Sequence, residues 1–243
     1  MSEFDRRSFL KLAGGAAVSV GSAGWIAQAI AHGKITPTAS DVFIVVDVQK
    51  CFIPGGSLAV EHGDEVVPLI NAIARKFEYV VMTQDWHTAD HVSFASQHEG
   101  KKPFEMIDLP YGKQVLWPDH CVQGTEGADF APGLDIPHAV LVIRKGYHRD
   151  VDSYSTFMEA DKKTPTGLTG YLKQRGVKRC YLAGLATDFC VAWSAMDARS
   201  AGFQASVIED ASRGINLGGT GIEAAWKEMA AKGVKRIQSG DLA

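Results

Sequence analysis

The sequence predicts a single doubly wound α/β domain with a mainly parallel sheet of five to six strands. Short apolar runs of strand length alternate with segments of helical apolar spacing from residue 41 almost to the C-terminus. No internal repeat and no break in composition divides this stretch. The runs are rich in β-branched and aromatic residues, as is typical of parallel strands buried on both faces. We therefore expect three layers, with helices on both sides of the sheet.

Each expected strand is an apolar run that ends at a polar residue or a turn. In chain order these runs are Val42–Val46, Tyr79–Gln84, Ala139–Arg144, Arg179–Leu185, Gln204–Glu209 and a short edge strand at Val234–Gln238.

Each expected helix shows apolar residues three or four positions apart. The helices are Pro68–Phe77, a segment near Gly167–Arg175, Phe189–Ala201 and Ile222–Lys232. The remaining segment, Thr88–Pro137, is long, irregular and rich in Gly, Pro and His. Such a segment is typical of a functional loop rather than a linker.

The composition favours a globular protein that acts on a small molecule. The 243 residues are 46% apolar and 22% charged, close to ordinary usage for a folded domain. The formal net charge is −3, and the chain has no basic stripe. Nucleic-acid binding depends on such a stripe, so we expect no nucleic-acid partner.

The N-terminal segment, residues 1–31, has the pattern of a twin-arginine export signal. Arg6-Arg7 is followed by Ser-Phe-Leu-Lys and by a weakly apolar run to about Ile30, and Ala27-Gln-Ala29 and Ala29-Ile-Ala31 both fit a cleavage site. Asp5 departs from the usual Ser or Thr before the arginines. We expect a periplasmic protein without a membrane partner after removal of the signal, whose catalytic domain is residues 32–243. The alternatives are an uncleaved anchor and an amphipathic N-terminal helix.

Reactive side chains follow four of the expected strands. Asp47, the group Asp85-Trp-His87, Lys145 and Cys190 each lie at a strand end or in the turn after it. The carboxyl ends of parallel strands share one edge of the sheet, where ligands bind. A carboxylate, a metal-type cluster, an ammonium and a thiol are therefore expected to converge on one crevice.

Cys190 is the candidate nucleophile of this crevice. It opens an expected helix, where exposed N–H groups lower the pKa of a thiol and can hold an oxyanion. Asp47 is the candidate general base and acid, and Lys145 is its candidate ionic partner. The structural alternatives are an inert buried Cys190, a capping or ion-paired Asp47, and a solvated Lys145.

The histidines near the second strand end resemble a metal site. Asp85, His87, His91 and His120 offer ligands suited to one divalent ion of zinc, manganese or iron. The alternative is a set of ordinary surface and core histidines. Phe52 and Trp117 flank these groups and could sandwich a flat aromatic ring, although core packing also explains such residues.

The chain contains four cysteines, at positions 51, 121, 180 and 190. In an oxidising compartment the sequence allows a disulfide between Cys51 and Cys121. A disulfide to Cys190 would prevent the proposed chemistry. Cys180 lies inside an apolar run and is expected to be a buried hydrophobe.

These segments resemble the nicotinamidase/pyrazinamidase branch of the isochorismatase-like cysteine hydrolases. The resemblance covers essentially all of residues 41–242. Its strings are Asp47-Val-Gln-Lys-Cys-Phe52, Thr83-Gln-Asp-Trp-His-Thr-Ala-Asp-His91, Ser93-Phe-Ala-Ser-Gln-His-Glu-Gly100, Leu116-Trp-Pro-Asp-His-Cys-Val-Gln-Gly-Thr125, Arg144-Lys-Gly146, Tyr154-Ser-Thr-Phe157 and Gly184-Leu-Ala-Thr-Asp-Phe-Cys190. The export signal departs from the family, which is better known as cytoplasmic.

The resemblance implies a Rossmann-like three-layer fold and a metal-dependent nicotinamidase with a Cys thioester intermediate. It implies an Asp47–Lys145–Cys190 triad, an oxyanion hole formed by the N–H groups of Ala186 and Cys190, and a cis peptide at Ala186–Thr187. It also implies a metal held by Asp85, His87 and His120, with His91 as a fourth ligand or as a support behind the ligands. Phe52 and Trp117 would stack on the pyridine ring of a small aromatic amide.

Other functions remain open at this point. One is an amidase of the same superfamily that acts on a carbamoyl or ureido substrate, and another is an isochorismatase proper, which needs no Cys. A third is a periplasmic binding protein without turnover. A homo-oligomer also remains open.

Overall fold

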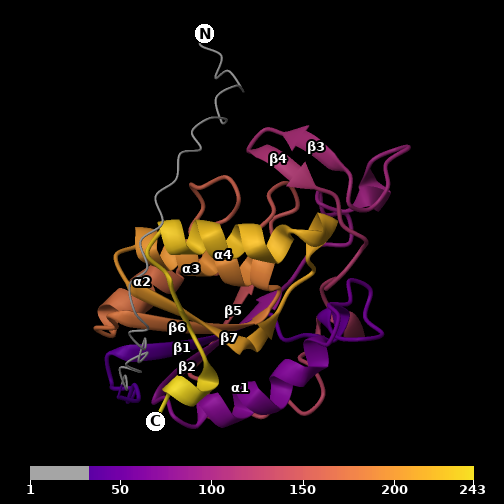
Figure 1. Ribbon diagram of the computed structural model, residues 1–243. Helices are drawn as coiled ribbons and strands as arrows, with labels where there is room; N and C mark the ends of the chain where they lie inside the picture. The colour runs from indigo at the N-terminus through magenta and orange to yellow at the C-terminus, as the bar shows by residue number, and fades with distance from the viewer. Residues whose placement is uncertain (1–32) are drawn as a thin grey trace, which may run out of the picture. The chain divides into compact units, whose positions relative to one another are not determined.

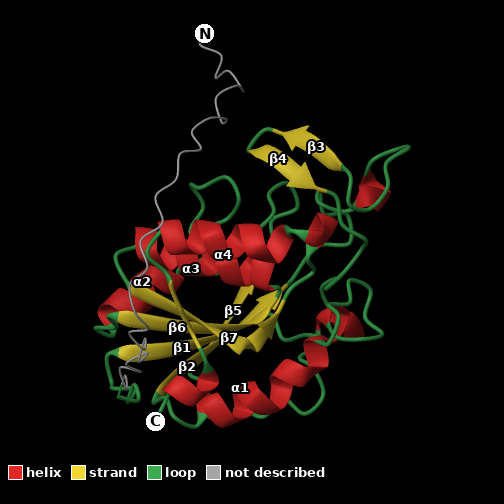
Figure 2. Cartoon of the chain, viewed as in Figure 1, coloured by secondary structure: helices red, strands yellow, loops and turns green. Residues whose placement is uncertain are grey.

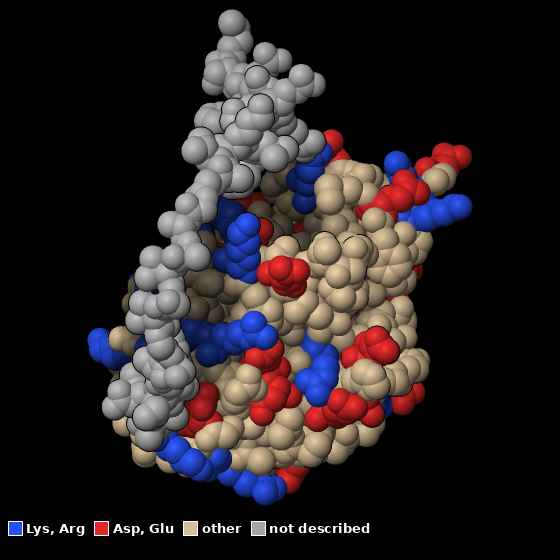
Figure 3. Space-filling model, viewed as in Figure 1, with Lys and Arg blue, Asp and Glu red and all other residues tan. Residues whose placement is uncertain are grey.

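The structure is a computed structural model that describes residues Gly33–Ala243 (Figure 1). The expected export signal therefore lies outside the described residues. Among the residues described, no helix has the length and apolar character needed to cross a membrane. Basic and acidic side chains are interspersed over the face drawn in Figure 3.

The centre of the fold is a six-stranded sheet in which every neighbouring pair is parallel. The strand order is β5-β2-β1-β6-β7-β8, which confirms the predicted parallel sheet. The strands are β1 (Asp41–Val46), β2 (Tyr79–Asp85), β5 (Leu141–Lys145), β6 (Arg179–Leu185), β7 (Gln204–Arg213) and β8 (Lys235–Ile237).

Helices cover both faces of this sheet and complete the three layers (Figure 2). Helix α1 (Val66–Ala74) packs on one face, in a cluster with alternate residues of the strands. Helices α2 (Leu168–Gln174), α3 (Ala192–Ser200) and α4 (Gly221–Ala231) pack on the other face. The architecture is the doubly wound arrangement that the alternation of strands and helices predicts.

Strand β1 shows why the central runs are apolar without interruption. Phe43 and Val45 belong to the core on the side of α1, whereas Val42, Ile44 and Val46 belong to the core on the opposite side. All six residues of the strand are buried. Since successive side chains of a strand point to opposite faces, a strand covered on both faces needs apolar residues at every position.

The direction of the chain reverses between β1 and β6. From β1 it proceeds outward through β2 to β5, and from β6 it proceeds the other way through β7 to β8. The backbones of the two strands approach closely at Gly184, where a Cβ atom would lie 2.1 Å from the carbonyl oxygen of Val46. Gly184 also has a φ of +128°, so only glycine fits. The crevice at such a reversal is where doubly wound folds bind ligands.

Three elements differ from the prediction by three residues or more at one end. Strand β7 continues four residues beyond the predicted end at Glu209 to Arg213. The helix predicted from Phe189 is divided into a π-helical turn, Thr187–Val191, and the α-helix α3. The helix predicted as Pro68–Phe77 begins at Val66 and ends at Ala74.

The prediction that Thr88–Pro137 is irregular throughout was wrong. It contains an antiparallel pair, β3 (Met106–Leu109) and β4 (Gly112–Val115), which forms a separate two-stranded sheet. These strands are only four residues long and mix polar with apolar residues, because most of their side chains are exposed or half-buried. An exposed strand of this length leaves little periodicity to recognise.

Candidate active site

The structure brings together the four reactive groups that follow the strands. Asp47 follows β1, Asp85 ends β2, Lys145 ends β5, and Cys190 lies in the π-helical turn between β6 and α3. All four side chains are buried. One side-chain atom each of Asp47, Asp85 and Cys190 lies within 4.8 Å of the others. The edge of the sheet thus carries two carboxylates, an ammonium and a thiol in one small volume.

Lys145 is at the centre of this group. Its Nζ lies 2.8 Å from Asp47 Oδ2, 2.6 Å from Asp85 Oδ1 and 2.8 Å from the carbonyl oxygen of Ser153. The Sγ of Cys190 is 3.4 Å away from the same nitrogen. The ammonium donates to Asp85 Oδ1, to the Ser153 carbonyl and to the Cys190 sulfur, and it forms an ion pair with Asp47 Oδ2, so this buried charge is fully paired.

The two carboxylates differ in their affinity for a proton. Burial raises the pKa of Asp47, and the attraction of Lys145 offsets this only in part. Burial acts on Asp85 in the same direction, but Lys145 and His87 outweigh it and hold the pKa of Asp85 well below its usual value. Carboxylates whose pKa values are pushed apart can take different tasks, one exchanging protons and the other remaining ionised.

Lys145 remains an ammonium in this setting. Burial by itself would lower the pKa of the amine, but the charges of Asp47 and Asp85 hold the pKa of Lys145 well above its usual value.

Asp47 is fixed by a hydroxyl that sequence reasoning missed. The Thr83 hydroxyl donates to Asp47 Oδ1 at 2.5 Å, and the N–H of Asp47 donates to the same hydroxyl oxygen at 3.1 Å. Asp47 has a φ of +47°, in the left-handed region that Asp tolerates better than most residues. A polar, β-branched residue inside the buried run of β2 was the available signal for Thr83.

The expectation of a lowered thiol pKa for Cys190 was wrong. Burial raises the pKa of the Cys190 thiol well above its usual value; the charge of Lys145 opposes this, and the charges of Asp47 and Asp85 add to it. The physical reason is desolvation, which outweighs the nearby ammonium because Cys190 is only 5% exposed. The thiol therefore needs a nearby base, and Asp47 is suitably placed.

The turn after β6 carries both residues of the expected oxyanion hole. Ala186 and Cys190 line the same pocket. The carbonyl oxygen of Ala186 accepts the N–H groups of Phe189 and Val191, both at 3.1 Å. The cis peptide is Leu185–Ala186 rather than the expected Ala186–Thr187, so it lies one residue earlier in the chain.

Three of the four expected metal ligands converge. The Nε2 atoms of His87 and His120 lie 3.2 and 3.5 Å from Asp85 Oδ2. The Nδ1 atoms of the two rings lie 2.8 Å from the Gly146 carbonyl oxygen and 2.9 Å from that of Pro118. A carbonyl only accepts, so each Nδ1 carries a hydrogen, and in the neutral form of each ring Nε2 has the lone pair that a metal ligand needs. This donor set fits a divalent ion.

Gly146 has a steric role beside these ligands. A Cβ atom at this position would lie 2.5 Å from the Cε1 atom of the His87 ring, and the residue has a φ of +67°. Only glycine allows the backbone carbonyl to approach and orient His87.

His91 lies behind His87 rather than beside the other donors. The two ring centroids are 4.2 Å apart. His91 Nδ1 lies 2.7 Å from the Ser93 hydroxyl and accepts the Ser93 N–H at 3.3 Å, while Nε2 lies 3.3 Å from the Val151 carbonyl oxygen. Both ring nitrogens therefore have protein partners. Of its two expected roles, this geometry favours support of His87.

A pocket next to the thiol is lined mainly by apolar and aromatic side chains. Phe52 and Trp117 belong to it, as expected for residues that contact a ring. The other lining residues are Leu58, Asp85, His120, Asp152, Tyr154, Ala186, Phe189, Cys190 and Ile215. Sequence reasoning assigned no role to Asp152 or Tyr154, although Tyr154 opens one of the recognised strings.

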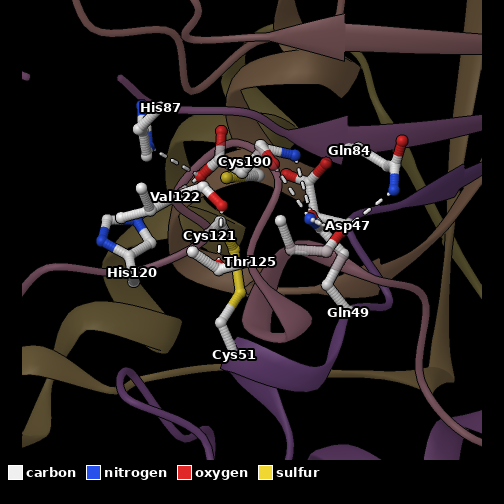
Figure 4. The surroundings of a disulfide bond; sticks show 12 residues. Asp47, Gln49, Cys51, Gln84, His87, His120, Cys121, Val122, Thr125 and Cys190 are labelled. Atoms are coloured by element: carbon white, nitrogen blue, oxygen red, sulfur yellow. Dashed lines mark hydrogen bonds and ion pairs between the residues drawn. A yellow bond between two sulfur atoms is a disulfide. The ribbon is translucent and has the colours of Figure 1, made fainter. Parts of the chain in front are cut away.

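Cys51 and Cys121 form a disulfide across a sequence separation of 70 residues (Figure 4). It joins the segment of Phe52 to the segment of His120, so it connects the aromatic wall to the candidate metal ligands. Cys180 and Cys190 are free and buried. Because Cys51 pairs with Cys121, the Cys190 thiol remains free to react.

Comparisons with known proteins show the family to which the chain belongs. The family model described as "Isochorismatase domain" matches residues 41–241. A curated nicotinamidase from Acinetobacter baylyi is 57% identical over 199 residues, which cover 82% of this chain and 92% of that protein. The chain belongs to the isochorismatase family.

Two solved structures extend the similarity to the fold. A nicotinamidase/pyrazinamidase of Acinetobacter baumanii superposes with a TM-score of 0.84 at 58% identity, covering 85% of this chain and 99% of that one. A pyrazinamidase of Pyrococcus horikoshii, solved in complex with zinc, superposes with a TM-score of 0.67 at 36% identity, covering 82% of this chain and 99% of that one.

Proposed function

We propose that this chain is a metal-dependent amidohydrolase that converts nicotinamide to nicotinate and ammonia and also accepts pyrazinamide. The observation that carries the proposal is the buried Lys145, which holds the candidate base Asp47 and contacts the candidate nucleophile Cys190. The names of the relatives, which are nicotinamidases and pyrazinamidases, indicate the aromatic amide as the substrate.

The reaction begins when the Cys190 sulfur attacks the carboxamide carbon while Asp47 takes the thiol proton. The raised pKa of Asp47 suits it to accept that proton. The N–H groups of Ala186 and Cys190 hold the oxyanion of the tetrahedral intermediate. Asp47 then returns the proton to the departing nitrogen, the C–N bond breaks, and ammonia leaves behind a thioester.

The second half of the reaction uses the same residues. Asp47 takes a proton from water, and the resulting hydroxide attacks the thioester carbon. The C–S bond breaks, the proton on Asp47 returns to the Cys190 sulfur, and the acid loses its own proton to solvent and is released as nicotinate. Lys145 keeps its charge throughout and compensates the negative charge that moves between carboxylate and sulfur.

Asp85, His87 and His120 would hold a divalent ion, with Asp85 Oδ2 and the two Nε2 atoms as donors. When bound, the ion supplies a Lewis acid that orients and polarises the substrate or a water molecule. We place zinc before manganese and iron, because a relative was solved with zinc. Phe52 and Trp117 hold the pyridine ring, and His91 supports His87.

The proposal is tested by ammonia release from nicotinamide by the purified protein. We expect ammonia release to fall after chelation and to return when Zn²⁺, Mn²⁺ or Fe²⁺ is added back, because chelation removes the positive charge of the ion from the site. Release that is insensitive to chelation would contradict the metal assignment. No release with any metal would instead favour a carbamoyl or ureido substrate, or a binding protein without turnover.

We further propose that residues 1–31 direct this domain to the periplasm by the twin-arginine route. The support is the Arg6-Arg7 pattern and the weakly apolar segment that follows it. The route carries folded proteins, which suits a domain that would acquire its metal ion before export.

A further inference from the structure

The hairpin formed by β3 and β4 has one fully buried side chain among its eight strand residues, and that side chain is polar. Gln114 is 1% exposed, whereas the other strand positions are exposed or half-buried. Burial of an amide is costly unless each of its polar atoms has a partner. The position of Gln114 therefore has to be explained by what it contacts.

Gln114 reaches from the hairpin toward the wall of the pocket. Its Nε2 lies 2.8 Å from Asp152 Oδ2, 2.7 Å from the Val115 carbonyl oxygen and 2.8 Å from the Tyr154 hydroxyl. Its Oε1 accepts the Tyr111 hydroxyl at 3.0 Å. The Val115 carbonyl only accepts hydrogen bonds, so Nε2 must face it and the orientation of the amide is determined. The two hydrogens of Nε2 serve these three acceptors, so one N–H is shared between two of them.

The Tyr154 hydroxyl connects Gln114 to the aromatic wall. It accepts the Trp117 indole N–H at 3.0 Å, and an indole N–H can only donate. The Tyr154 and Trp117 rings also pack on Phe189, with centroid distances of 5.5 and 4.8 Å. The orientation of the indole therefore depends on where the Tyr154 oxygen is held.

Asp152 anchors the amide nitrogen of Gln114 to the main domain. Its Oδ1 accepts the N–H of Ser153 at 2.7 Å, and its Oδ2 accepts Gln114. The residue is 2% exposed and follows β5 by seven positions, so it belongs to the main domain and not to the hairpin. Through the same nitrogen, Gln114 is thus held by Asp152 of the main domain and holds the Tyr154 hydroxyl.

We propose that Gln114 is a positioning residue for the aromatic amide: it holds the Tyr154 hydroxyl and, through it, the indole of Trp117. This inference rests on the proposed function. Gln114 does not line the pocket, so it acts on the substrate only through residues that do, which are Tyr154 with Trp117 and Asp152. The outer hairpin thereby contributes to recognition of the ring without contacting it.

The first test is Gln114→Met, which keeps the length of the side chain and removes its hydrogen bonds. We expect the KM for nicotinamide to rise about 5- to 10-fold, the effect of one lost hydrogen bond, with kcat within about twofold. If the Tyr154 and Trp117 rings bind the substrate and the transition state with equal strength, a change in their position alters KM and leaves kcat unchanged. The matched control is Lys113→Gln, which breaks only the exposed pair with Asp108 and should leave KM unchanged.

A double-mutant cycle with Tyr154→Phe separates positioning from a general effect on the hairpin. If Gln114 acts through the Tyr154 hydroxyl, Gln114→Met should raise the KM of the Tyr154→Phe protein by less than about twofold. An equal rise of KM in both backgrounds would overturn the proposal, as would an unchanged KM in the single variant. Gln114→Asn, which retracts the amide by one methylene, replaces Gln114→Met in the cycle if that protein does not fold.

The same assays distinguish this inference from the proposed function. If the wild-type protein and Lys113→Gln release no ammonia from nicotinamide, the proposed function fails, and this inference fails with it. If both release ammonia and the Gln114 variants keep the wild-type KM, only the positioning role of Gln114 is wrong.

Discussion

At the scale of single residues, Lys145 determines how the candidate site is organised. Its ammonium pairs with Asp47, which our mechanism uses for proton transfer, and with Asp85, which also faces His87 and His120. One oxygen of Asp85 therefore faces the ammonium, and the other faces the two candidate histidine ligands. A side chain with this many buried ionic contacts contributes to stability as well as to chemistry.

Replacement of Lys145 by Met should reduce both activity and stability. It leaves two buried carboxylates without their cation, which costs about 3–5 kcal/mol of unfolding free energy. Ammonia release should fall by several orders of magnitude, because the negative charge near Cys190 is no longer compensated. Denaturant unfolding and the ammonia assay measure the two effects.

The matched control for Lys145→Met is Lys50→Met. Lys50 pairs with Glu126 at 2.8 Å, but this pair is largely exposed to solvent. Exposed pairs contribute little, so Lys50→Met should leave the unfolding transition and the activity nearly unchanged. Equal losses in the two variants would contradict the central role of Lys145.

At the scale of elements, the long segment between β2 and β5 supplies two of the side chains that line the pocket. It carries His120 and Trp117, the β3–β4 hairpin and Cys121, and it is joined to the segment after β1 by the Cys51–Cys121 disulfide. The Gln49 side chain also donates from that segment to the carbonyl oxygen of Ala128, at 2.9 Å. These links hold two irregular segments in place where helices and strands do not.

Removal of the disulfide should destabilise the protein. The double variant Cys51→Ala, Cys121→Ala loses a cross-link over a long loop, for which we expect about 2–4 kcal/mol of unfolding free energy. Denaturant unfolding in the absence of reductant measures the loss. The control is Cys180→Ala, which removes a free buried thiol and no cross-link. Coincident unfolding curves for the wild type and the double variant would show that the cross-link contributes nothing.

At the scale of the whole molecule, the described domain and the N-terminal segment have different tasks in our proposals. The domain, Gly33–Ala243, contains the complete candidate site. The segment before it, residues 1–31, would serve only as the export signal. Separate tasks predict that a change in the signal alters where the enzyme is found and leaves its activity intact.

The variant Arg6→Lys, Arg7→Lys should remain in the cytoplasm as an uncleaved precursor. Recognition by the twin-arginine route depends on the paired guanidinium groups, which lysine does not replace. Cell fractionation and the mass of the protein measure the outcome, with Arg75→Lys in α1's C-terminal turn as the control. Periplasmic mature protein in both variants would contradict the export proposal.

Local patterns along the chain were sufficient to predict the alternation of strands and helices, the doubly wound class and the reactive residues at four strand ends. These features are local, because periodicity and buried apolar runs are readable along the chain. The topology then required Asp47, Asp85, Lys145 and Cys190 to meet, since parallel strands end at one edge.

Other features could be established only from three-dimensional contacts. They are the β3–β4 hairpin, the Cys51–Cys121 disulfide, the contact of Asp85 with Lys145 and the direction of the pKa shift of Cys190. Gln114 and Tyr154 meet across 40 positions of the sequence, in a contact that no periodicity predicts. Hydrogen bonds, ion pairs and desolvation depend on distances between segments far apart in the chain, and folding alone sets those distances.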